Sequence, residues 1–100
     1  MSIKRSEYIF TIGFSADTAI VDGNAMRRYG RLSTEELIAE GLYKAAFASA
    51  LFSGEKEELS LVLGAYNKAA GTSFESTERL KRVFGLDLPT EKIVKTRILK

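Results

Sequence analysis

The sequence predicts a small α+β domain in which a three-stranded antiparallel sheet packs against three or four helices, in the order ββαααβ. Three observations support this prediction. Large apolar residues occupy every second position near the N-terminus, two capping boxes precede apolar helical patterns, and apolar and basic residues alternate near the C-terminus. A chain of 100 residues has room for one core. We therefore expect a single domain over residues 1–100, with flexible ends at residues 1–6 and 100.

An N-terminal β-hairpin supplies two of the strands. Between Glu7 and Phe14, a period of two indicates a half-buried strand, whose large apolar residues are Tyr8, Phe10, Ile12 and Phe14. A turn-like segment, Ser15 to Asp17, separates it from the β-prone run Thr18–Val21. The two runs should pair in an antiparallel hairpin. Asp22 then ends the second strand and is placed to cap a short helix over residues 25–29.

Helices are expected through the middle of the chain. Ser33 and Glu36 form a capping box that should begin a helix at Thr34. Gly41 interrupts the pattern, so residues 34–52 form either one kinked helix or two. A further helix should run from residue 55 to residue 71. A second capping box, residues 72–75, should begin the next helix, which Gly85 would close.

The C-terminus should form the third strand. Val94, Thr96 and Ile98 alternate with Lys95 and Arg97, which again is a period of two. The pattern does not set the order of the strands in the sheet.

The composition argues against an enzyme. Histidine and cysteine are absent, so the chain has no histidine-dependent triad, no thiol nucleophile and no imidazole or thiolate metal ligand. Phosphate-binding glycine loops are also absent. Asp17 and Asp22 are expected as turn and cap residues. We expect no catalytic site, no metal and no cofactor; only carboxylate, tyrosine or lysine chemistry stays open, for instance at Lys44 with a pKa lowered by burial.

Targeting signals are not apparent. The N-terminus lacks the apolar stretch of a signal peptide, and no apolar run reaches the roughly 18 residues that a membrane span needs. We expect a cytoplasmic protein that does not enter a membrane.

The segment from Leu42 to Phe52 is apolar almost all round. Such a helix is usually buried, but in a small domain one side can instead form an interface with a second copy or with another protein. The interface candidates are Tyr43, Phe47, Ala50 and Phe52. The first functional hypothesis is therefore a non-catalytic protein-association module, with a homodimer through residues 42–52 as one form of it.

Basic residues gather near the C-terminus. From Arg79 to Lys100, seven cations stand against Asp87 and Glu91, although the net charge of the whole chain is only +2. Clustered cations favour a phosphate backbone. Nucleic-acid binding is therefore the alternative hypothesis, and its candidate residues are Arg79, Lys81, Arg82, Lys95 and Arg97. A solvated basic face explains the same cations without a ligand.

Overall fold

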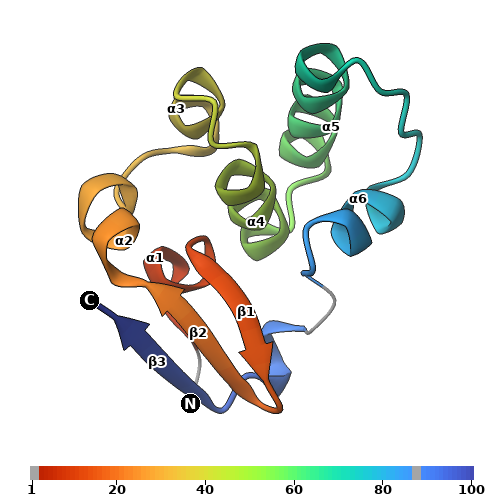
Figure 1. Cartoon of the computed structure of the whole chain (residues 1–100). Coiled ribbons are helices and arrows are strands. Elements are labelled where there is room, and N and C mark those ends of the chain that lie inside the picture. Colours follow the sequence, from red (N-terminus) through yellow and green to blue (C-terminus); the bar gives the residue numbers. More distant parts are fainter. Residues whose placement is uncertain (1–2, 87–88) are drawn as a thin grey trace.

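The structure is a computed structural model that describes residues 3–86 and 89–100. It confirms an α+β domain in which helices pack against a three-stranded sheet (Figure 1). The elements along the chain are α1 (Arg5–Tyr8), β1 (Thr11–Ser15), β2 (Thr18–Asp22), α2 (Gly23–Tyr29), α3 (Thr34–Ala39), α4 (Tyr43–Ser53), α5 (Lys56–Ala70), α6 (Thr77–Val83), a 3-10 turn (Thr90–Lys92) and β3 (Lys95–Leu99).

The sheet has the order β1-β2-β3 and is mixed rather than antiparallel. The hairpin is confirmed, because β1 and β2 pair antiparallel from Ser15 opposite Thr18 onward. Ala16, in the two-residue turn, has a φ of 54°, as tight hairpin turns require. The expectation of a purely antiparallel sheet is wrong, because β3 runs parallel to β2, with Lys95 opposite Thr18.

The direction of β3 follows from where the chain returns to the sheet. After β2 the chain passes through all the remaining helices, and such a long crossover is what a parallel pair needs. It comes back at the hairpin turn, where the N–H of Val94 donates to the carbonyl of Asp17 over 2.9 Å. The strand therefore starts beside the start of β2.

The first strand is shorter than predicted, and Tyr8 lies in α1 instead. The N–H of Lys4 donates to the Glu7 carboxylate over 3.1 Å and fixes the first turn of that helix. The register between β1 and β2 shifts between Thr11 and Gly13. Because of this shift, Ile12 does not point into the core as the period of two predicts, and its side chain is exposed. At the expected flexible end, Ile3 is buried and Arg5 begins α1, while Met1 and Ser2 lie outside the described residues.

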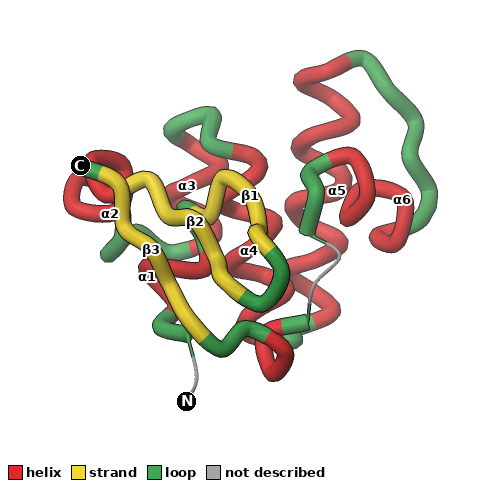
Figure 2. The backbone as a smooth tube through the Cα atoms, turned by 60° about the horizontal axis from the view of Figure 1, so that its bottom comes forward, coloured by secondary structure: helices red, strands yellow, loops and turns green. Residues whose placement is uncertain are grey.

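The two faces of the sheet differ in cover. Ala19 and Val21 are fully buried, and their partners Thr96 and Ile98 in β3 share this face. In Figure 2, α1, α3 and α4 lie behind the sheet, and α5 and α6 lie to its right. Lys95, Arg97 and Leu99 of β3 are on the opposite face and are exposed.

Two of the expected helix starts are confirmed. The Asp22 carboxylate accepts from the N–H of Ala25 and caps α2. Ser33 and Glu36 form the capping box of α3, and the hydrogen bonds from the backbone N–H and then the side chain of Ser33 lower the pKa of the Glu36 carboxyl. Gly41, with a φ of 75°, divides residues 34–52 into two helices rather than one kinked helix.

The prediction that a second capping box over residues 72–75 begins a helix is wrong. The side chain of Asn67 accepts from the N–H of Phe74 over 3.0 Å and donates to its carbonyl over 2.8 Å. This holds the segment as a loop, and α6 begins only at Thr77, with Ser76 as its cap. Leu80 of this helix is buried as expected, whereas Val83 is exposed.

The core is centred on α4, and it also takes residues from the sheet, α1, α5 and α6. The largest fully buried side chains are Phe47, Ile9, Leu37, Leu80, Leu86, Ile93, Val21 and Val62.

Candidate functional site

The interface candidates on α4 separate into core and surface. Phe47 and Ala50 are both 0% exposed, and the Phe47 ring packs on Phe84 at 5.8 Å between centroids. Phe52 is 38% exposed and lies at 5.9 Å from the Tyr8 ring. Tyr43 is half-buried. Burial of α4 within the chain therefore accounts for most of its apolar character, and only Tyr43 and Phe52 are accessible to a partner.

Tyr43 belongs to an open, largely apolar groove of about 450 Å³. We call it the Lys44 groove. Residues of β1, α2 and the N-terminal end of α4 line it together with Tyr66 of α5 and Phe84, which follows α6. The side chains that define it are Phe10, Ile12, Tyr43, Lys44, Tyr66 and Phe84. Its size falls within the range of small-molecule sites in proteins, roughly 300–1,000 Å³.

Lys44 is the cation of this groove. Its side chain is half-buried, and desolvation lowers the pKa of the ammonium group below its ordinary value. The unfolded chain then holds this proton more tightly than the folded chain does. The charged form consequently costs stability at neutral pH, and this cost falls as the pH rises from the lowered pKa to the ordinary lysine pKa, above which it is absent. The expectation of a lysine pKa lowered by burial is confirmed in direction.

Asp22 also lines the groove. Its carboxylate is engaged at the start of α2, 3.1 Å from the N–H of Ala25. Among the described residues, no carboxylate lies within ion-pair distance of Lys44. The groove thus combines an apolar wall with a cation that makes no ion pair with Asp22, the carboxylate in the same lining.

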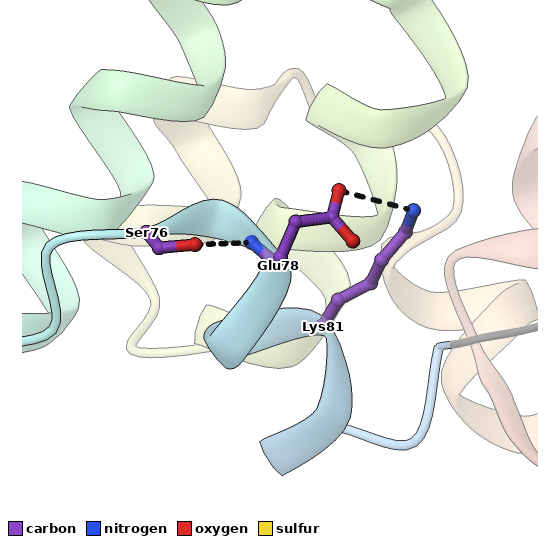
Figure 3. Close-up of polar contacts among 3 residues, drawn as sticks. All are labelled: Ser76, Glu78 and Lys81. Carbon is purple, nitrogen blue, oxygen red and sulfur yellow. Dashed lines mark hydrogen bonds and ion pairs between the residues drawn. The ribbon is translucent and has the colours of Figure 1, made fainter.

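The basic C-terminal candidates do not form one surface. Figure 1 shows α6 beside α5, away from β3. On α6, Lys81 pairs with Glu78 at 3.7 Å, while the hydroxyl of Ser76 accepts from the N–H of Glu78 (Figure 3). The Arg79 guanidinium lies 5.9 Å from the centre of the Phe74 ring.

The remaining cations of that set lie in β3. Lys95 and Arg97 are exposed on the open face of the sheet, opposite Thr18 and Ile20 of β2. The structure therefore brings these two together and separates them from Arg79, Lys81 and Arg82. A nucleic acid would meet two small basic areas instead of one.

A partly buried polar network joins α1, α3, α4 and α5, and the sequence does not predict it. Arg5 of α1 donates to the carbonyls of Gly30 and Leu32 and, over 2.8 Å, to the hydroxyl of Ser49. Ser49 lies 2.8 Å from the hydroxyl of Thr34, which donates to the Glu58 carboxylate over 2.6 Å.

The direction of the hydrogen bonds in this network follows from the donors available. A guanidinium only donates and a carboxylate only accepts. Because Thr34 gives its single proton to Glu58, Ser49 must donate to Thr34. The bonds therefore run in one direction from cation to anion and polarise one another. The one sequence signal was Ser49, a polar residue within the apolar helix that needs a partner when buried.

Removing the Ser49 hydroxyl should destabilise the fold. Ser49→Ala leaves Arg5 without one acceptor and Thr34 without its donor, which costs about 1–3 kcal/mol. Urea denaturation measures the change. Ser60→Ala, at an exposed position of α5, is the matched control and should lose nothing. Equal stabilities of the two variants would mean that the network contributes no stability.

The described part of the chain contains neither a metal-binding cluster nor a helix that could span a membrane. Within residues 3–86 and 89–100, no three His, Cys, Asp or Glu side chains gather closely enough to hold a metal ion. Over the same ranges, no helix is both long and apolar enough to cross a membrane. Asp17 is a turn residue, and its carbonyl anchors the start of β3.

No family model, no curated protein and no solved structure matches this chain, so its function has to be inferred from its own residues.

Proposed function

We propose that the chain is a non-catalytic protein-association module that accepts a strand of a partner protein beside β3. The observation that supports this most directly is the apolar exposure of an edge strand. Val94, directly before β3, is 55% exposed, and Ile98 and Leu99 of β3 are 41% and 38% exposed; β2 is the only described strand that pairs with β3. An edge strand presents unpaired N–H and C=O groups, which a further strand can satisfy.

A hollow beside β3 gives an added strand somewhere to place a side chain. It measures about 400 Å³ and lies between the N-terminal segment around α1 and the start of β3. Ile3, Ile93 and Val94 form its apolar part, and Lys4 and Glu7 are among its polar residues. An apolar side chain on the covered face of a partner strand would fit this hollow.

The two faces of β3 define the chemistry of the partner. Thr96 and Ile98 point to the covered face, so side chains next to them should be apolar. Lys95 and Arg97 point to the open face, where opposite charges across strands stabilise and like charges destabilise a pair. The partner strand should therefore alternate acidic and apolar residues.

A second copy of the chain fits this edge less well. Pairing of β3 with itself would bring Lys95 and Arg97 of both copies onto one face, where they repel. We expect light scattering to give the mass of a monomer at low and high salt. A dimer that is insensitive to salt would contradict this expectation and would favour self-association through Tyr43 and Phe52.

The strand proposal can be tested with a short, end-blocked peptide in which valine and glutamate alternate. We expect it to bind the chain in calorimetry. Reversing both charges of β3, Lys95→Glu with Arg97→Glu, should weaken binding about tenfold or more, and should create affinity for the matching valine and lysine peptide. The control reverses Arg79 and Arg82 on α6 and should change neither affinity.

Two outcomes would overturn the strand proposal. One is failure of the wild-type chain to bind the acidic peptide at low salt. The other is equal weakening by the β3 and α6 reversals, because a diffuse charge effect does not need an edge strand. Binding of a single-stranded oligonucleotide in place of the peptide, lost through the β3 reversal and steeply weakened by salt, would instead support the nucleic-acid alternative at Lys95 and Arg97.

A further inference from the structure

The Lys44 groove is separate from the edge of β3 and has its own chemistry. Most of its wall is aromatic or aliphatic, contributed by Phe10, Ile12, Tyr66 and Phe84. A largely apolar pocket with a few convergent polar groups is the usual form of a small-molecule site. The body of a molecule that fills it should therefore be apolar.

The charge of the groove selects one end of that molecule. Lys44 supplies an ammonium group, and the other ionisable side chains of the lining are Asp22, Tyr43 and Tyr66. The Asp22 carboxylate accepts from the N–H of Ala25 at the cap of α2, and each tyrosine contributes a hydroxyl group. A cation that is partly desolvated among apolar side chains interacts more strongly with an anion than one in water does. An anionic group on the ligand would complement Lys44.

The backbone at the start of α4, like Lys44, favours a negatively charged ligand. Among the hydrogen bonds of the described residues, none uses the N–H groups of Tyr43, Lys44 or Ala45, and Leu42 provides no side-chain cap. These three residues all line the groove. Free N–H groups and the positive end of the helix dipole favour negative charge at this end of α4.

We propose that the Lys44 groove binds a small amphiphilic carboxylate, with its apolar body against Phe10, Tyr66 and Phe84 and its carboxylate beside Lys44. A medium-chain fatty acid has this chemistry. The groove, at about 450 Å³, accommodates such a chain. The acid lowers its free energy through apolar burial and through the charge-assisted hydrogen bond to Lys44.

The test compares an acid with the alcohol of the same chain length. We expect decanoate, kept below the concentration at which it forms micelles, to bind the full chain in calorimetry with one site per chain. Lys44→Met keeps the apolar stem and removes the charge. It should weaken decanoate binding about tenfold and leave decanol binding unchanged.

Controls separate a site from a general charge effect. Lys68→Met, on the exposed surface of α5, should bind decanoate as the wild type does. Lys44→Met should remain folded, because the charged lysine costs stability in this place; circular dichroism checks this. Failure of wild-type decanoate binding, equal weakening by both substitutions, or unchanged binding after Lys44→Met would each overturn the proposal. The acidic-peptide experiment at β3 has no bearing on these outcomes.

Discussion

Replacement of Phe47 by aspartate is expected to abolish cooperative folding. The ring is fully buried in α4 and packs on Phe84. Removing it as Phe47→Ala alone should cost about 3–5 kcal/mol. Aspartate adds the burial of a charge without a partner, which costs several kcal/mol more or forces the carboxyl to stay protonated. Domains of this size are stable by only about 5–15 kcal/mol, so the folded state should no longer dominate.

Phe52→Asp is the matched control. Phe52 belongs to the same helix and was an interface candidate on the same grounds, but it is partly exposed. Its replacement should weaken the contact with Tyr8 and leave a folded chain. Circular dichroism with thermal unfolding distinguishes the two variants. A folded, soluble monomer from Phe47→Asp would mean that Phe47 lies at a surface, as the interface hypothesis requires, and would contradict its place in the core.

Local signals in the sequence predicted most of the elements because their causes are local. Asp22 caps α2 and Ser33 with Glu36 caps α3, through hydrogen bonds that span only three residues. Gly41 divides a helix through its own φ. The misplaced start of α6 has a different cause. Thr72 to Glu75 has the pattern of a capping box, but Asn67 of the preceding helix binds the backbone of Phe74 and holds that segment in a loop.

Local sequence signals could not predict the features that depend on contacts between distant segments. A period of two indicates a strand but carries no direction, so the parallel pairing of β3 depends on the crossover and on the contact of Val94 with Asp17. The bulge at Ile12 likewise depends on the register with β2.

The candidate sites show the same division between local and long-range causes. Among the interface candidates, Tyr43 and Phe52 are accessible while Phe47 and Ala50 are buried, a split that residue type alone cannot give. The Lys44 groove collects side chains from segments as far apart as Ile9 and Phe84. The sequence suggested that burial would affect Lys44, but only the fold reveals the cavity beside it.

Gly23→Ala is expected to destabilise the attachment of β3, by about 2–3 kcal/mol in urea denaturation. Gly23 is the first residue of α2, and a Cβ there would overlap the carbonyl oxygen of Leu99 and approach the side chain of Ile98. The Leu99 oxygen is backbone, so no rotamer change relieves the overlap and the end of β3 must move. Amide hydrogen exchange in β3 should accelerate more than in α4.

Gly64→Ala is the opposite case within the same fold. Gly64 lies in the interior of α5, and a Cβ there would meet nothing within 4 Å. Alanine should therefore stabilise the chain by about 0.5–1 kcal/mol, because it restricts the unfolded backbone and favours the helix. If Gly23→Ala also stabilised the chain, backbone entropy rather than close packing would govern Gly23. The end of β3 would then be held by its pairing with β2 and not by close packing against Gly23.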